Sequence, residues 1–237
     1  MDKLDKNRDI IGYSNDILTI NKLEILLEEF VKENNFENNL LFKQLDQLKP
    51  RKLGFTLAPF YFAVSYWLDN LQLFYMNLIN ISDNEYAELV KENICDEFGI
   101  ENGIVDIKKS HKITYTNFLS SLGYKNRIII TPAVEKFNKE LENSLYQNRI
   151  QLHACILGAI EYFYISISTM LKEYCDKNGI EQSHYKIHEI LDKKHSMDLF
   201  KVAINYGANI DDFKHGLWRG YGMLWNVYEN LWKEYDD

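Results

Sequence analysis

Hydrophobic residues recur at three- and four-residue intervals along almost the whole chain, a pattern typical of amphipathic helices. Only 3 Pro and 11 Gly interrupt it, which is too few for the turns of a many-stranded sheet protein. We therefore predict an all-α bundle that forms a single domain over residues 1–237, because no repeat or linker divides the chain. The predicted helices cover residues 17–34, 36–48, 55–80, 83–98, 111–122, 131–146, 149–177, 183–207 and 211–235.

Three segments need a separate interpretation. Residues 99–110 form the longest polar connector, and we expect a loop there. Residues 128–131 (IIIT) could form a strand, but the following Pro132 favours the first turn of a helix. Residues 152–171 are long and apolar enough to span a membrane, yet Glu161 lies near their centre. The central helix of a soluble bundle is the better interpretation of that segment.

The segment from His188 to His195 carries the strongest chemical signal. His188, Asp192 and His195 are spaced i, i+4 and i+7, so they lie on one face of a helix within about two turns. With 6 His and 35 acidic residues, this spacing arises by chance about 0.02 times per chain. The same stripe continues through apolar or aromatic positions, namely Leu199, Val202 and Tyr206.

Three polar groups on a buried stripe are costly unless a metal ion or another partner satisfies them. The alternative is an exposed charged face, to which Lys193 and Lys194 could belong. Those lysines lie on the opposite side of the helix, so we interpret the triad as half of a metal site.

Other helices should supply the remaining ligands. Glu161 shares a helix face with small or apolar residues, namely Ala154, Leu157, Ile165 and Ser168. A lone carboxylate in such surroundings must be paired, protonated or bound to a metal. Pairing with a Lys or Arg from a neighbouring helix is the alternative for Glu161.

Glu97 and His111 flank the polar connector. Glu97 extends an inward stripe that begins at Tyr86, whereas Glu92 and Asp96 are expected to point away from it and Glu101 falls in the connector. His111 begins a short helix, where a histidine is as often an exposed cap residue as a ligand. The other histidines, His153, His184 and His215, show no comparable pattern.

Composition argues against some classes of binding partner and indicates the cellular compartment. A net charge of −8 disfavours binding to nucleic acid and to anionic membrane surfaces. The N-terminus lacks the apolar segment of a secretory signal. Cys95, Cys155 and Cys175 are odd in number and far apart, which suits reduced thiols. We therefore expect a cytoplasmic protein that binds neither nucleic acid nor membrane.

In order and spacing, residues 55–210 resemble the haem-oxygenase-like diiron oxidases, a branch of the helical superfamily that includes the TenA-like thiaminases. The resemblance rests on Asp96-Glu97-Phe98-Gly99, on Ser110-His111 through Leu122-Gly123, on Gly158-Ala159-Ile160-Glu161 and on the triad. The connector between Glu97 and His111 is longer than usual for this family.

The resemblance implies a haem-oxygenase-like bundle in which six side chains hold two iron ions, with manganese as an alternative, and no haem. The implied ligands are Glu97, His111, Glu161, His188, Asp192 and His195. Carboxylate and imidazole ligands without thiolate suit Fe(II) or Mn(II). A natural division assigns Glu97, His111 and Glu161 to one ion and the triad to the other, with one bridging carboxylate.

The implied activity is O2-dependent oxidation of a small metabolite derived from an amino acid, amine or fatty acid, in specialised metabolite or cofactor biosynthesis. An electron donor and a homodimer are compatible with it. Trp218, Arg219, Trp225 and Trp232 could add aromatic walls and one cation to a substrate pocket, or simply belong to an amphipathic closing helix.

Two alternatives stay open. A TenA-like hydrolase would use Cys155 as its nucleophile, although Cys155 and Glu161 lie about 120° apart around one helix. A non-catalytic helical protein would hold its metal for structural reasons only.

Overall fold

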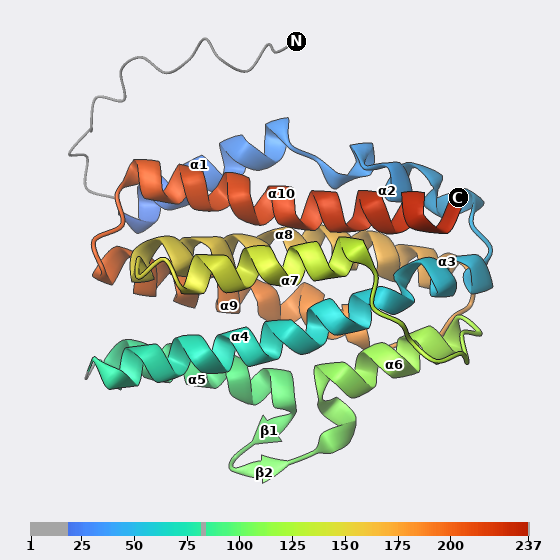
Figure 1. The fold of residues 1–237 in the computed structure, drawn as a ribbon, viewed down its shortest axis with the longest axis horizontal. Coiled ribbons are helices and arrows are strands. Elements are labelled where there is room, and N and C mark those ends of the chain that lie inside the picture. Colours follow the sequence, from blue (N-terminus) through green and yellow to red (C-terminus); the bar gives the residue numbers. More distant parts are fainter. Residues whose placement is uncertain (1–18, 82–83, 237) are drawn as a thin grey trace.

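The computed structural model describes residues 19–81 and 84–236, and 81% of it is helical (Figure 1). The predicted all-α class is confirmed. The helices are α1 (Ile20–Glu33), α2 (Leu40–Gln44), α3 (Pro50–Leu57), α4 (Tyr61–Asn80), α5 (Asn84–Phe98), α6 (His111–Ser121), α7 (Pro132–Leu145), α8 (Ile150–Lys177), α9 (His184–Asn205) and α10 (Ile210–Asp236).

The predicted helix at 36–48 was wrong in its continuity. It consists of α2 between two 3-10 turns, η1 (Phe36–Asn38) and η2 (Leu45–Gln47). Asn39 caps α2, since its Oδ1 accepts from the Leu41 N–H at 3.1 Å. Its Nδ2 donates to the Trp225 carbonyl at 2.9 Å, which ties this segment to α10. Residues 17, 18 and 83, predicted as helix ends, lie outside the described residues.

The predicted helix at 55–80 is also divided. Helix α3 begins earlier, at Pro50, and ends at Leu57, and the 3-10 turn η3 (Ala58–Phe60) separates it from α4. Pro59 explains the break, because a proline has no N–H to donate to the preceding turn. By contrast, Pro132 begins α7 as predicted, and residues 128–131 form no strand.

The connector 99–110 holds more structure than the predicted loop. Strands β1 (Ile100–Glu101) and β2 (Ile104–Val105) form a short antiparallel hairpin, followed by the 3-10 turn η4 (Ile107–Lys109). Gly99 adopts φ +69° at its base, and a Cβ there would lie 2.5 Å from the Asp106 carbonyl oxygen. Only glycine therefore fits where the chain leaves α5.

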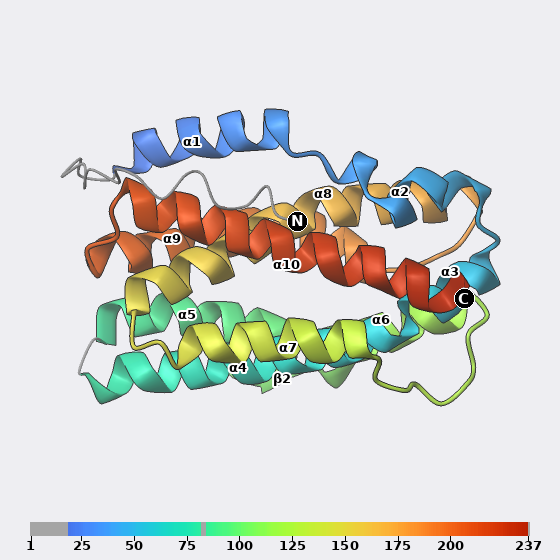
Figure 2. The ribbon, with the colours of Figure 1, turned by 45° about the horizontal axis from the view of Figure 1, so that its top comes forward.

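Helix α8 is the centre of the bundle. It packs most extensively against α9 and α10, while α4 packs against α5 and α7 (Figures 1 and 2). Figure 2 shows α4, α5, α6 and α7 in one layer and α8, α9 and α10 in the other. Helix α8 is long and apolar enough to cross a membrane, but 72% of its apolar window is buried, as in the core helix of a soluble protein.

Two glycines let α10 lie close against α8. A Cβ on Gly216 would come within 2.4 Å of the Cys155 Cβ, and one on Gly220 within 2.7 Å of the Ala159 Cβ. The pairs repeat with the same four-residue spacing on both helices, so the small residues form one continuous contact. This contact positions the face of α8 that carries Glu161.

We predict that Gly220→Ala lowers the free energy of unfolding by about 1–3 kcal/mol, because the added methyl group overpacks the contact. Gly222→Ala is the matched control on the same helix, since a Cβ added there would meet nothing within 4 Å. It should stabilise the protein by about 0.5–1 kcal/mol through helix propensity. Urea titration of both variants tests this, and equal effects would contradict the proposed contact.

Candidate metal centre

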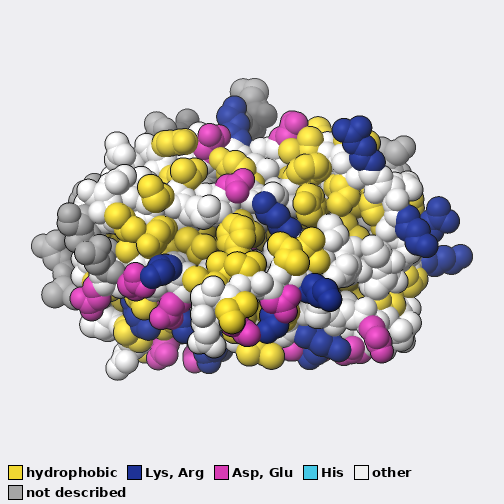
Figure 3. Space-filling view, turned by 90° about the horizontal axis from the view of Figure 1, so that it is seen from below, with side chains coloured by type: hydrophobic (Ala, Val, Ile, Leu, Met, Phe, Trp, Pro, Cys, Tyr) yellow, Lys and Arg dark blue, Asp and Glu magenta, His cyan; other side chains and the backbone are white. Residues whose placement is uncertain are grey.

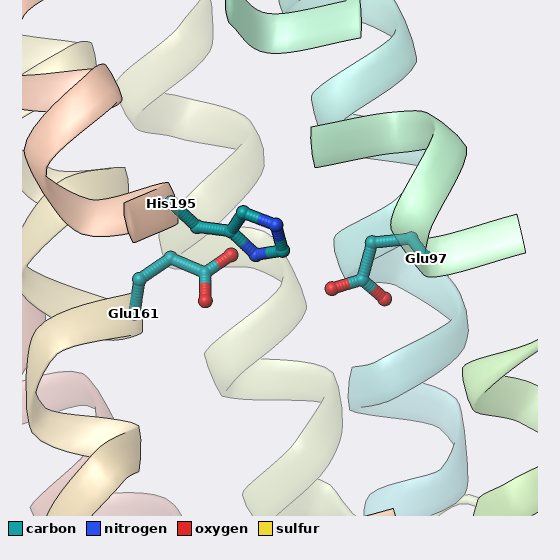
Figure 4. Close-up of side chains that lie close together, drawn as sticks. All are labelled: Glu97, Glu161 and His195. Carbon is teal, nitrogen blue, oxygen red and sulfur yellow. The ribbon is translucent and has the colours of Figure 1, made fainter. Parts of the chain in front are cut away.

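Three buried side chains from three helices converge between the two layers. Glu97 comes from α5, Glu161 from α8 and His195 from α9, and one potential ligand atom of each lies within 4.8 Å of the others. Figure 4 shows the three side chains pointing toward one another. All three are at most 3% exposed. The structure thus brings together residues that lie up to 98 positions apart in sequence.

His111 joins this group from α6. Its Nδ1 lies 2.5 Å from Glu97 Oε2, and both side chains are buried. Burial opposes ionisation, but the contact with His111 holds the pKa of Glu97 below its usual value. Burial alone would lower the pKa of His111. The negative charge of Glu97 has the larger effect, so the pKa of the imidazole is raised. The hairpin and η4 return the chain so that α6 begins at this residue.

His188 and Asp192 complete the six predicted residues. Their Nδ1 and Oδ1 atoms are 2.9 Å apart on α9, and the His188 ring lies 4.4 Å from the ring of His111. Burial and the neighbouring His111 lower the pKa of His188 well below its usual value. All six predicted residues therefore lie in one buried cluster, while their role as ligands remains a prediction.

Two carboxyl groups of the cluster resist ionisation. Burial, together with the nearby Asp192, raises the pKa of Glu161 well above its usual value. Burial also raises the pKa of Asp192. Glu161 also accepts a hydrogen bond from a neutral neighbour: the Asn93 Nδ2 atom lies 3.4 Å from Glu161 Oε1. One long hydrogen bond is too little to stabilise the charge of a buried carboxylate, which agrees with the raised pKa of Glu161.

Asp96 is a site residue that the sequence analysis placed wrongly. It was expected to point away from the stripe, but its Oδ2 lies 3.0 Å from His195 Nε2. This hydrogen bond lowers the pKa of Asp96. Because Nε2 contacts Asp96, the Nδ1 atom of His195 is the ring nitrogen available to bind a metal ion in the cluster. Such a carboxylate–histidine pair is the usual way to orient an imidazole that binds a metal.

The cluster fits a metal ion because several of its buried polar atoms lack a hydrogen-bond partner among the described residues. They are Glu97 Oε1, Asp192 Oδ2, His195 Nδ1 and both ring nitrogens of His111. The His111 Nδ1 atom is close to Glu97 but without hydrogen-bond geometry. Orphaned buried atoms of this kind are rare, and a bound cation would satisfy them.

The two predicted halves of the ligand set lie side by side. His195, which the prediction groups with His188 and Asp192, also has a potential ligand atom within 4.8 Å of those of Glu97 and Glu161. The reason is that His195 lies almost two turns beyond His188, at the level where α9 faces α5 and α8. Which residues bind which ion stays a prediction.

A pocket adjoins the cluster on the side of α4, α7 and α10. The cavity has a volume of about 40 Å³. Its polar lining consists of Glu97, Glu161, Tyr164 and His188. The rest of the lining is apolar: Phe60, Ala63, Val64, Trp67, Phe137, Ile160 and Leu224. Several of these aromatic residues showed no signal in the sequence beyond their helical periodicity.

A second hollow lies on the hairpin side of the cluster. Asp96 and His111 line it together with Glu101, Lys109 and several apolar residues of α9. Figure 3 views the molecule from this side and shows hydrophobic side chains gathered across the middle of the face. The hairpin segment contributes exposed apolar residues, namely Ile104, Val105 and Ile107. The cluster is thus flanked by an apolar pocket and by a hollow whose lining mixes charged and apolar residues.

The C-terminal helix contributes less to the pocket than the sequence suggested. Of α10, only Leu224 is among the described lining residues. Trp218 is 57% exposed, and the Arg219 guanidinium lies 3.4 Å from Gln147. Trp225 donates to Glu229 at 2.6 Å. The alternative interpretation, an amphipathic closing helix, describes α10 better.

His184 has a defined role beside the cluster. It is buried, and its Nδ1 lies 3.0 Å from the Thr114 hydroxyl. Its ring packs edge-on against His188 at 4.5 Å. The imidazole therefore supports the position of His188.

Comparison with known proteins supports the fold. No protein-family model matches the sequence, and no curated protein matches it. Two crystal structures of a CADD-like protein of unknown function from Nostoc punctiforme PCC 73102 are similar to this chain. The first, at 2.00 Å, has a TM-score of 0.72 at 15% identity and covers 90% of this chain and 97% of its own. The second, at 1.35 Å, has a TM-score of 0.69 at 16% identity, with 91% and 95% covered.

The likeness to these structures agrees with the predicted all-helical bundle, which is confirmed. At such low identity, the likeness concerns the fold alone.

We predict that metal binding releases protons and strengthens as the pH rises. The raised pKa values of Glu161 and Asp192 mean that both carboxyl groups keep their protons to higher pH, and a metal ion must displace them. Calorimetric titration with Mn(II) in buffers of different ionisation enthalpy measures the released protons. Glu161→Gln should release fewer, and a heat independent of the buffer would contradict the prediction.

We also predict that Asp96→Asn weakens Mn(II) binding by about 10- to 100-fold, because the amide no longer holds His195 as a carboxylate does. Glu92→Gln is the matched control one turn earlier on α5. Glu92 is exposed and contacts Lys194 at 2.9 Å. Its substitution should leave the affinity unchanged. Equal affinities for the two variants would refute a positioning role for Asp96.

Proposed function

We propose that this protein is a non-haem diiron oxidase that uses O2 to oxidise a small molecule. The observation that carries the proposal is the buried cluster of three carboxylates and three imidazoles with orphaned ligand atoms. Carboxylate and imidazole donors without a thiolate suit Fe(II) or Mn(II). Helical bundles commonly hold dinuclear carboxylate sites in this way. Glu97, His111, Glu161, His188, Asp192 and His195 would hold the ions.

Bound iron would supply the electrons and the open coordination positions that O2 chemistry needs. The described side chains do the remaining work. Asp96 keeps the proton of His195 on Nε2 and turns Nδ1 toward the cluster. The aromatic wall of Phe60, Trp67 and Phe137 excludes water from the substrate side. The resulting low dielectric protects reactive species from water and strengthens the charge interactions of the cluster.

The observations on Cys155 argue against a cysteine hydrolase. Cys155 is 0% exposed, and its Cβ is covered by Gly216 of α10. Burial raises the pKa of its thiol, so the nucleophilic thiolate is disfavoured. A purely structural metal is a weaker candidate too, because structural sites are usually closed and this cluster opens into a pocket. We further infer a cytoplasmic enzyme supplied by an external electron donor.

Anaerobic loading with Fe(II) followed by mixing with O2 tests the function. We expect close to two iron ions per chain, O2 consumption only by the loaded protein, and no change in Cys155→Ser. His195→Ala should lose at least half of the iron because it removes a ligand and leaves Asp96 unpaired. His215→Ala is the matched control, because His215 is an exposed histidine on α10.

The outcomes separate the three hypotheses. One bound zinc ion with no O2 consumption would indicate a structural metal. Hydrolysis of thiamin fragments that disappears in Cys155→Ser would indicate a TenA-like enzyme. Full iron occupancy in His195→Ala would remove that residue from the ligand set.

A further inference from the structure

The hollow on the hairpin side of the cluster is framed by strongly exposed apolar residues. It has a volume of about 330 Å³, and residues of α9 and of the hairpin segment line it. Four of the six most exposed large hydrophobic side chains among the described residues lie around it, each at least 61% exposed. They are Ile104, Val105, Ile107 and Ile190. We call the hollow and these four residues the hairpin face. An exposed apolar patch of this kind marks a contact with another molecule.

Lysines border the hairpin face on both of its segments. Lys108 and Lys109 end the turn η4 that follows the hairpin. Lys186 and Lys193 lie four and three residues from Ile190 on α9, spacings that place them beside it on the helix surface. All four lysines are exposed. The hairpin face therefore has an apolar centre and a basic border.

Most of this positive charge is not neutralised by the protein itself. Lys109 pairs with Glu101 at 2.8 Å. Lys108, Lys186 and Lys193 make no ion pair among the described residues. The chain as a whole carries a net charge of −8, so this local basic border contrasts with the rest of the molecule. A partner with an acidic surface complements it.

The hairpin face also lies beside the candidate metal centre. Asp96 lines the hollow, and its Oδ2 atom lies 3.0 Å from His195 Nε2. The Asp96 side chain is 35% exposed, whereas the His195 side chain is completely buried. A molecule seated on this face would thus be separated from the cluster by a single hydrogen-bonded pair.

We propose that the hairpin face docks an acidic electron-transfer protein, whose carboxylates meet the lysines and whose apolar centre covers the isoleucines. The inference rests on the proposed function, because the oxidase needs an external electron donor. In each encounter the donor would lose one electron and the oxidised centre would gain it, along the Asp96–His195 hydrogen bond. Encounters between redox proteins are small and transient, and charge steers them, which suits an apolar centre with a charged border.

A membrane and a second copy of this chain fit the hairpin face less well. Glu101 and Asp106 are interspersed with the exposed apolar residues, and their carboxylates would lose water on entering a bilayer. Two copies that each carry a charge of −8 repel one another. An acidic protein partner avoids the first cost and compensates for its own repulsion at the basic border.

The test titrates the metal-free protein with an acidic [2Fe–2S] ferredoxin in a calorimeter. Both proteins are acidic overall, so binding requires a local basic face. We expect binding at about 20 mM salt that weakens by about tenfold or more at about 200 mM salt, because screening removes the attraction. No measurable binding at the lower salt concentration would overturn the proposal.

A pair of double variants locates the ferredoxin. Lys186→Glu combined with Lys193→Glu should weaken binding by about tenfold or more, because it reverses the charge of the border. The matched control combines Lys32→Glu with Lys43→Glu, two exposed lysines of α1 and α2 on the opposite edge of the bundle (Figure 1). It changes the net charge equally and should alter the affinity by less than about twofold. Equal weakening by the two double variants would refute the assignment.

The apolar centre is tested in the same way. Ile190→Ser should weaken ferredoxin binding by about threefold or more, since it removes a large part of the apolar contact. Ile25→Ser is the matched control, because Ile25 is 56% exposed on α1. Phosphatidylserine vesicles and sedimentation velocity of the protein alone examine the other occupants. Vesicle binding or dimer formation that disappears in Ile190→Ser, while ferredoxin affinity is unchanged in that variant, would overturn the proposal.

This design separates the two proposals, because binding is measured without iron or O2. If the protein consumes O2 with iron but does not bind ferredoxin, the oxidase function stands and the docking assignment is wrong. If ferredoxin binds with the expected dependence on the lysines but the iron-loaded protein consumes no O2, the docking surface stands and the oxidase function fails. In an active oxidase, the rate at which reduced ferredoxin is oxidised should fall in the Lys186→Glu and Lys193→Glu double variant and not in its control.

Discussion

The candidate site depends on charge that is buried without enough partners. Glu97, Glu161 and Asp192 are each at most 3% exposed, and the groups around them are mainly other carboxyl groups and imidazoles. Without a cation the cluster avoids part of this cost by keeping protons, as the raised pKa values of Glu161 and Asp192 indicate. A multivalent cation removes the need for those protons and satisfies the orphaned atoms. Metal affinity and the stability of the bundle core are therefore thermodynamically linked.

Helix packing decides where this charge meets. Helix α9 aligns His188, Asp192 and His195 by its own periodicity, and α8 places Glu161 opposite them. Gly216 and Gly220 allow α10 to press α8 toward that position. The apolar contacts that bury the helices thus provide the energy that holds unfavourable polar groups together, as expected where a site is built on rigid elements.

The parts of this arrangement that could be predicted from sequence are those set by local periodicity. The triad and Glu161 lie on apolar stripes, so their burial followed from spacing alone. Asp96 could not be found in this way, because it lies about 100° around α5 from Glu97 and its partner is 99 residues away. The two-residue strands of the hairpin are too short to produce a pattern, and the break at Pro59 was hidden by continuous hydrophobicity.

The pocket illustrates the same limit. Trp67 and Phe137 come from separate helices, and in the sequence each is indistinguishable from an ordinary core residue. Arg219 looked available as a cation until its contact with Gln147 was known. Once the walls are assembled, the polarity differs across the cluster: aromatic rings cover one side, while Asp96, Glu101 and Lys109 line the hollow on the other. A ligand on the aromatic side therefore meets no Lys or Arg among the described lining residues, whereas the hollow on the other side offers Lys109.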